Sequence, residues 1–283
     1  MALFSLLVAI LIERLKLLPQ SWQLDSMLNL YSKTLFGNKQ LNSDVMMALA
    51  LILPAIAVQV IMWAVNGLLW GGVSLILWVG ISILCFSHLK QRQLFKHYML
   101  AACRGDSQAC YHFAEALDPS ASLEAVSEQE LGAKVGQSAA WLNYRFYGAV
   151  AIFLIFLGPA GAVFYCTARY FSDKSQAHKL ELPLVEDVLM LLDWLPSRIF
   201  AFGYLLSGQF SQAFTRWGQY AFNIRSSARD IVTQVALAAE PQAESSTMPI
   251  CTQATLALLQ LSKRNFILLL ICLSILTIFG VVA

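Results

Sequence analysis

Long apolar stretches alternate with short polar ones along the chain, and the apolar stretches have the length of membrane-spanning helices. A helix rises about 1.5 Å per residue, so about 20 apolar residues cross the ~30 Å hydrocarbon layer of a bilayer. Four segments meet this requirement: Met46–Asn66, Leu68–Ser87, Tyr147–Ala168 and Asn265–Ala283. The pattern predicts an all-α, polytopic membrane helical bundle with about four spans plus interfacial and cytoplasmic helices.

Three other segments show a helical pattern that is less suited to crossing. Met1–Ile12 is apolar but short, so we expect it to lie in or dip into the membrane interface. Leu182–Leu206 is nearly as apolar as the spans, but it carries charges and two prolines, and we expect it to pack against protein or lie at the interface. Leu89–Leu117 is amphipathic, and we expect it to continue the second span into the cytoplasm.

These patterns divide one membrane domain, 1–283, into successive segments. They are an N-terminal interfacial and cytoplasmic segment (1–45), a helical hairpin (46–87), a cytoplasmic helical segment (88–146), a third span (147–172), an amphipathic segment with a linker (173–262) and a C-terminal span (263–283). Gly158-Pro159 can break the third span, which then either crosses fully or is re-entrant. Ser120–Gln129 and Glu240–Met248 are expected to be loops.

Composition and charge agree with a membrane protein. The chain is 58% hydrophobic and 13% charged, against roughly 25% charged residues in soluble domains. The net charge of +2 indicates no nucleic-acid partner. Basic residues follow the second span and precede the last, which predicts that both ends face the cytoplasm of a bacterial inner membrane: His88, Lys90, Arg92, Lys96, Lys263 and Arg264. The six cysteines show no paired spacing typical of zinc sites.

Polar clusters beside the spans are the candidates for a site. Because hydrocarbon excludes charge, we expect them to converge on one protein-lined pocket. Each polar cluster also has an alternative interpretation without a binding site. Its charged residues can be solvated helix ends, surface ion pairs or side chains that reach the lipid headgroups. Arg198 is expected to pair with Asp193 or a carboxylate of the cytoplasmic segment. The candidates are Glu13, Arg14, Arg104, Asp106, Glu115, Asn143, Arg145, Arg169, Asp187, Asp193 and Arg198.

Common catalytic motifs are absent from the sequence. It contains no GxxxxGKS/T phosphate loop, no GxGxxG after a strand, no HExxH and no GxSxG. No cofactor or catalytic residue is therefore assigned. Carboxylates could still hold Mg²⁺ with a nucleotide, and the candidates are Asp106, Glu115 and Asp193.

The order of these motifs resembles the AmpE family of inner-membrane proteins linked to the control of β-lactamase induction. The resemblance covers essentially the whole chain. It runs through Glu13-Arg14, Trp22-Gln23-Leu24-Asp25, Arg104-x-Asp106-Ser107, Trp141-x-Asn143-x-Arg145-Phe146-Tyr147 and Asp187-x5-Asp193-Trp194-x-Pro196-x-Arg198 to the C-terminal span.

The family distantly resembles the CobD/CbiB adenosylcobinamide-phosphate synthases, membrane enzymes that join an amino-alcohol to a corrinoid carboxylate. Gly158-Pro159-Ala160-Gly161 and Trp194-x-Pro196-x-Arg198 carry this likeness. Where the synthases have an acidic stretch before the third span, this chain has Trp141 to Phe146, and Arg169 replaces an Asn. The departures mean that carboxylate-dependent Mg²⁺ or acid–base chemistry does not carry over with the likeness.

The AmpE resemblance implies a regulatory protein of the response that links peptidoglycan turnover and β-lactam exposure to β-lactamase expression. Its expected partners are the lipid bilayer, an anionic small molecule or cell-wall-derived signal, and a membrane or cytoplasmic protein. The alternative is a membrane ligase or transferase of the CobD/CbiB type that uses nucleotide and Mg²⁺. Whether the chain is an enzyme stays open at this stage.

Overall fold

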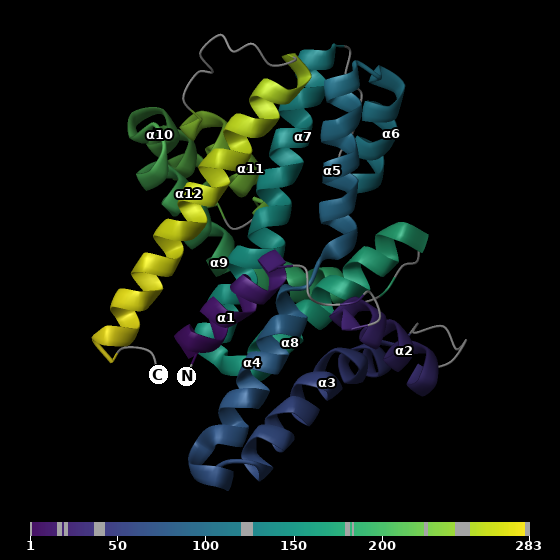
Figure 1. The fold of residues 1–283 in the computed structure, drawn as a ribbon, viewed down its shortest axis with the longest axis vertical. Helices are drawn as coiled ribbons and strands as arrows, with labels where there is room; N and C mark the ends of the chain where they lie inside the picture. The colour runs from purple at the N-terminus through teal and green to yellow at the C-terminus, as the bar shows by residue number, and fades with distance from the viewer. Residues whose placement is uncertain are drawn as a thin grey trace. The chain divides into compact units, whose positions relative to one another are not determined.

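The described part of the chain is helical throughout, which confirms the all-α prediction. A computed structural model describes residues 2–15, 19, 22–36, 43–119, 127–178, 182, 184–223, 226–240 and 250–280. Within these ranges every regular element is a helix, from α1 to α12 (Figure 1). The chain forms two compact units, and each is described by itself.

The first unit is built around α8 (Ala149–His178), and it comprises Met1–Ser87, Ala149–Leu192 and Cys272–Ala283. Four helices pack on α8: α1 (Ala2–Leu15), α2 (Leu24–Phe36), α3 (Asp44–Ala64) and α4 (Gly72–Phe86). The core between α3 and α8 contains Met47, Ala50, Leu51, Ala168 and Phe171. Here α8 forms the centre of the unit.

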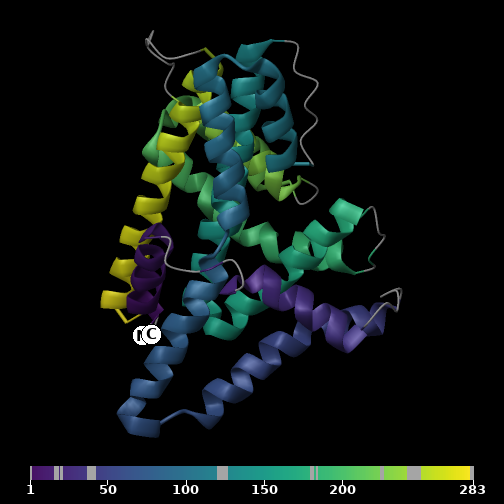
Figure 2. The same ribbon diagram turned by 45° about the vertical axis from the view of Figure 1, so that its right-hand side comes forward.

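Helices α3 and α4 are joined by the predicted turn, but they diverge from it instead of packing on each other as a tight hairpin: α3 packs on α8, and α4 packs on α1 and α8 (Figure 2). The turn contains Gly67 at a φ of +86°, a left-handed conformation that favours glycine, and a short 3₁₀ helix, η2 (Leu68–Gly71), follows it. The Asn66-Gly67 pair in the sequence indicated this turn.

Helix α8 contains the predicted break. Gly158 has φ 71° and ψ −168°, which is not a helical conformation, and Pro159 follows it. Because proline lacks the N–H of a helical hydrogen bond, the two halves of α8 meet at a kink.

The second unit comprises His88–Gly148 and Asp193–Ile271. It contains α5 (Leu89–Arg104), α6 (Ser107–Leu117), α7 (Glu128–Asn143), a π-helical turn η3 (Tyr144–Gly148), α10 (Phe210–Ala221) and α11 (Ala228–Ala239). Helices α5 and α6 lie side by side against α7, and α11 packs on α7 and α10 (Figure 1). Their shared core includes Tyr98, Ala102, Cys110, Leu117 and Leu131.

Two expectations for this unit were wrong in detail. Leu89–Leu117 is two helices rather than one, because Gly105 at φ +71° ends α5 and the chain turns back into α6. The expected loop at Ser120–Gln129 ends earlier, since Ser127 and Glu130 form a reciprocal capping box that starts α7 at Glu128. Residues 120–126 lie outside the described ranges, as do residues 241–248 of the second expected loop.

Four helices in the described ranges are long and apolar enough to cross a membrane. They are Asp44–Ala64, Glu128–Ala177, Val185–Ser207 and Thr252–Ile278, and the bent pair α4–α5 makes a fifth if it counts as one span. The predicted number is confirmed, but the set differs. Helix α9 (Val185–Ser207) qualifies, whereas α4, with 15 residues, qualifies only together with α5.

Helix α9 was not predicted to span the membrane, because its sequence carries charged residues. Asp193 and Arg198 are buried, while large apolar side chains are exposed along the rest of the surface: Met190, Leu191, Leu195, Ile199, Phe202 and Leu206. Asp193 and Arg198 therefore face protein and the apolar side chains face outward, an arrangement suited to lipid, whereas Glu186 and Asp187 are exposed in the first turn of the helix. The expectation that this segment packs against protein is confirmed for Asp193 and Arg198.

Helices α1 and α12 also expose apolar side chains. Helix α1 has 14 residues and is about 21 Å long, which is short of the hydrocarbon thickness. Its exposed side includes Phe4, Leu7 and Leu11. Helix α12 (Ile250–Ile278) exposes Ile267, Ile271 and Ile275.

Candidate functional site

The π-helical turn η3 brings a buried hydroxyl to a buried carboxyl in the second unit. The Tyr144 hydroxyl donates to Oδ1 of Asp193 at 2.6 Å, and both side chains are buried. A π-helical turn inserts extra backbone into a helix and is frequent at functional sites. This contact joins η3 and α9 across 49 residues of sequence.

Arg145 and Asn143 lie on the same stretch of chain. The Arg145 guanidinium carbon lies 5.6 Å from the centre of the Trp141 ring, and the side chain is buried. The side-chain oxygen of Asn143 is buried and accepts no hydrogen bond from the protein. A buried cation, a buried acceptor and the Asp193 carboxyl therefore occur within this one unit.

Arg198 has a different partner from the one expected. Its guanidinium donates to three backbone carbonyls, those of Ala221 at 2.9 Å, Asn223 at 2.8 Å and Trp194 at 2.7 Å. It also lies 4.5 Å from the centre of the Trp194 ring. The predicted pairing with a carboxylate is wrong, because the carbonyls at the end of α10 use the donors of this side chain.

Arg104, Asp106 and Glu115 are exposed on α5 and α6 of the second unit. Asp106 is the N-cap of α6, and its carboxylate accepts from the backbone N–H of Ala109 at 3.0 Å. This explains the Arg-Gly-Asp-Ser pattern as a helix boundary. Among the described residues no group of three His, Cys, Asp or Glu side chains could hold a metal ion, so Asp106, Glu115 and Asp193 do not form a shared Mg²⁺ site.

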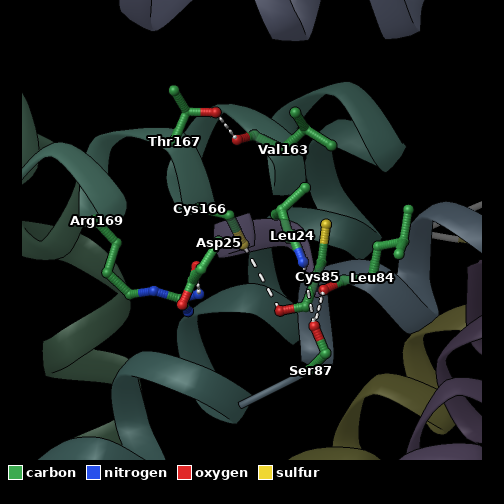
Figure 3. A network of polar contacts seen from close by, with 9 residues as sticks. All are labelled: Leu24, Asp25, Leu84, Cys85, Ser87, Val163, Cys166, Thr167 and Arg169. Carbon is green, nitrogen blue, oxygen red and sulfur yellow. Dashed lines mark hydrogen bonds and ion pairs between the residues drawn. The ribbon is translucent and has the colours of Figure 1, made fainter. Parts of the chain in front are cut away.

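The other candidates belong to the first unit. Glu13 is buried near the end of α1, whereas Arg14 and Asp187 are exposed. Arg169 of α8 is 1% exposed, and its Nη2 lies 3.9 Å from Oδ1 of Asp25 (Figure 3). The structure therefore assigns the candidates to two units and buries only some of them.

Several polar residues near these candidates were not predicted. Tyr144 was quoted within a motif but not as a site residue. In the first unit, the Ser87 hydroxyl accepts from the backbone N–H of Leu24 at 3.4 Å, and the Cys166 thiol lies 3.8 Å from the Cys85 carbonyl oxygen (Figure 3). Polar side chains in apolar runs were the available signal, but it does not indicate their partners.

Comparison with known proteins identifies the family. A family model described as "Regulatory signalling modulator protein AmpE" matches residues 1–283. The chain belongs to the AmpE family. A curated relative, Protein AmpE of Shigella flexneri, is 27% identical over 295 residues, which covers 99% of this chain and 99% of the relative. No solved structure matches.

Membership of the AmpE family confirms the resemblance seen in the motifs. Together with helices able to span a membrane, it supports a multi-pass membrane protein that modulates regulatory signalling.

Proposed function

We propose that this AmpE-family protein acts in the inner membrane in the response that links peptidoglycan turnover and β-lactam exposure to β-lactamase expression. The carrying observation is the regulatory family model, which matches the full chain. The apolar helices and the basic residues beside them support the inner membrane as its location.

We also propose that Arg145, with Asn143 and the Tyr144–Asp193 pair, binds an anionic small molecule or cell-wall-derived signal near the cytoplasmic face. A buried guanidinium beside an aromatic ring supports this idea, because such a cation attracts carboxylate and phosphate groups strongly. The π-helical turn supports it as well, since such turns are frequent where function requires an irregular backbone.

Gene deletion tests the regulatory role. We expect the deletion strain to show altered β-lactamase induction after exposure to a β-lactam, and the full-length gene to restore it. β-Lactamase activity before and after exposure is the measurement. Unchanged induction and unchanged susceptibility in the deletion strain would overturn the proposal.

A point variant tests the ligand role. We expect Arg145→Gln to fail to restore induction while the protein remains in the membrane at its normal level. The matched control is Arg216→Gln, an exposed arginine on α10. If both variants restore induction equally, Arg145 does not bind the signal.

A further inference from the structure

We propose that α8 is a re-entrant hairpin: it enters the bilayer from the cytoplasmic side, turns at Gly158-Pro159 and returns to the same side. This arrangement is independent of the regulatory role and of Arg145, because it follows from packing inside the first unit and from the charges along the chain. The tip of the hairpin then contacts lipid inside the hydrocarbon layer.

The two halves of α8 bend sharply toward each other. The rings of Phe153 and Tyr165 are stacked, with their centres 5.0 Å apart and their planes at 17°. In a straight helix, residues 153 and 165 are separated by about 18 Å along the axis and lie on different faces, so their rings cannot stack. The non-helical backbone of Gly158 lies between them in the sequence and produces the bend.

The second half of α8 runs alongside α4 and in the same direction. A Cβ at Gly158 would lie 3.5 Å from the ring of Trp78, in the middle of α4. Further on, the Cys166 thiol lies 3.8 Å from the carbonyl oxygen of Cys85, at the C-terminal end of α4 (Figure 3). These two steps are about 12 Å along α8 and about 11 Å along α4. After its turn, α8 therefore leads from the middle of α4 to the C-terminal end of α4.

That end of α4 is the cytoplasmic one by the positive-inside rule, because Lys90 and Arg92 follow it. The first half of α8 starts from the same side. Helices α5, α6 and α7 connect α4 to α8, and they have 16, 11 and 16 residues and carry charged side chains. None of these three helices is long and apolar enough to cross the hydrocarbon layer alone.

The last turns of α8 are attached to α2. Lys174 donates to the Ser32 hydroxyl of α2 at 3.0 Å, and the Arg169 guanidinium lies 3.9 Å from the Asp25 carboxylate of α2 (Figure 3). Because α3 and α4 lie between α2 and Lys90, two crossings return the chain to the side of α2. A fully crossing α8 would separate its end from α2 and would place Arg169 and Lys174 outside, against the positive-inside rule.

The surface of the turn suits lipid. Phe156 and Leu157, directly before Gly158, are 55% and 60% exposed, and Ile76 of α4 is 69% exposed. Irregular backbone at membrane depth must be covered by protein. Pro159 is buried and has no N–H to satisfy, and the Trp78 ring packs beside Gly158.

Labelling of introduced cysteines in the full-length protein tests the proposal. The buried Cys85, Cys110 and Cys166 are kept, since an aqueous reagent does not reach them, and Cys103, Cys251 and Cys272 are replaced by serine. This background, without an introduced cysteine, should not react with a membrane-impermeant maleimide. Variants with the Tm of the background in detergent are reconstituted in right-side-out and inside-out vesicles.

The introduced cysteines are Gln129→Cys at the start of α7, and Gln176→Cys or Ala177→Cys near the end of α8, all at exposed positions. We expect all three to react in inside-out vesicles only, whereas Asn66→Cys in the α3–α4 turn reacts in right-side-out vesicles only. Reaction of both Gln176→Cys and Ala177→Cys in right-side-out vesicles, with Gln129→Cys protected there, would overturn the proposal, because α8 then crosses the whole membrane.

A fluorescent NBD label tests the tip. On Leu157→Cys we expect lipids brominated in their acyl chains to quench the label more strongly than aqueous iodide does, and on Gln176→Cys we expect the reverse. Equal quenching of both positions by iodide would show that the turn does not enter the hydrocarbon layer.

Discussion

The hydrogen bond between Tyr144 and Asp193 keeps a carboxyl group inside the second unit. Asp193 is 3% exposed, and the Tyr144 hydroxyl approaches it to 2.6 Å. In an apolar helix such a carboxyl is costly without a donor, so the contact stabilises both α9 and the irregular turn η3.

Tyr144→Phe should therefore destabilise the protein. Removal of the hydroxyl leaves the buried carboxyl without this donor, which costs about 1–3 kcal/mol. Thermal unfolding in detergent measures the loss as a lower Tm. The control is Tyr220→Phe on α10, which removes a hydroxyl in the same way. If the two substitutions lower Tm equally, the hydrogen bond between Tyr144 and Asp193 does not contribute to stability beyond the general effect of removing a tyrosine hydroxyl.

Glu240 should make stability depend on pH. Burial raises the pKa of this carboxyl, at the end of α11, from 4.5 to about 7. The folded state therefore holds the proton more tightly than the unfolded state, and the stability this contributes is present below pH 4.5 and is lost as pH rises through 7. We expect Glu240→Gln to raise Tm at pH 8 and to change it little near pH 4; the reverse pattern would contradict this assignment.

The sequence predicts which residues are costly to bury but not which groups accompany them. Arg145, Asp193 and Arg198 were all expected inside the protein, and all three are buried. The sequence does not distinguish Asp106 as a helix cap from Asp106 as a ligand, because a carboxylate suits both. Nor can it show the partner of Arg198, because the carbonyls of Ala221 and Asn223 become available only where α10 ends.

Among the elements, helix ends were harder to predict than helix existence. Gly105 sits at a left-handed φ that ends α5, yet in the sequence it is a single glycine in an amphipathic pattern. The Gly158-Pro159 break was visible, because proline cannot donate within a helix whatever surrounds it. Helix α9 was expected to pack against protein or lie at the interface, and this holds for the buried Asp193 and Arg198, but the outward apolar face that lets it count as a span could be seen only in the three-dimensional structure.

A close approach between elements gives the third prediction. Gly208 follows α9, and a Cβ there would collide with the backbone carbonyl of Ala239, which also accepts from the N–H of Gln209 at 2.8 Å. We expect Gly208→Ala to lower stability by about 1–3 kcal/mol, since backbone must move to make room. Chemical unfolding of the detergent-solubilised protein measures the change.

Gly218 provides the matched control for Gly208. It lies inside α10, and a Cβ there would meet nothing within 4 Å. Gly218→Ala should stabilise by about 0.4–1 kcal/mol, because alanine loses less backbone entropy on folding. If both substitutions change stability in the same direction, the contact at Ala239 does not limit the size of residue 208.

For the whole molecule, the exposed surfaces of the long helices agree with a bilayer as the surrounding medium. Helix α3 exposes Leu49, Ile52, Ile56 and Val60, and α12 exposes apolar side chains on its C-terminal half. Basic residues follow α4 at Lys90 and Arg92 and lie within α12 at Lys263. The positive-inside rule therefore predicts that these two places lie on the cytoplasmic side of the membrane.

That orientation can be measured by labelling of introduced cysteines in a variant whose six native cysteines are replaced. The positions are Asn66 in the α3–α4 turn, Gln93 on α5 and Gln260 on α12, all exposed. A membrane-impermeant maleimide should label Asn66→Cys in right-side-out vesicles, and Gln93→Cys and Gln260→Cys only in inside-out vesicles. The reason is that the positive-inside rule favours the cytoplasmic side for the segments that carry Lys90, Arg92 and Lys263.

The Gln260 result also tests whether the chain crosses the membrane an even or an odd number of times between α5 and α12. Gln93 and Gln260 can share one side only if the intervening helices cross an even number of times. Full crossing by both Glu128–Ala177 and Val185–Ser207 satisfies this condition, and so does a re-entrant α8 with α9 outside the hydrocarbon. Labelling of Gln260→Cys from the outer side would exclude both arrangements, because it requires an odd number of crossings and places Lys263 and Arg264 against the positive-inside rule.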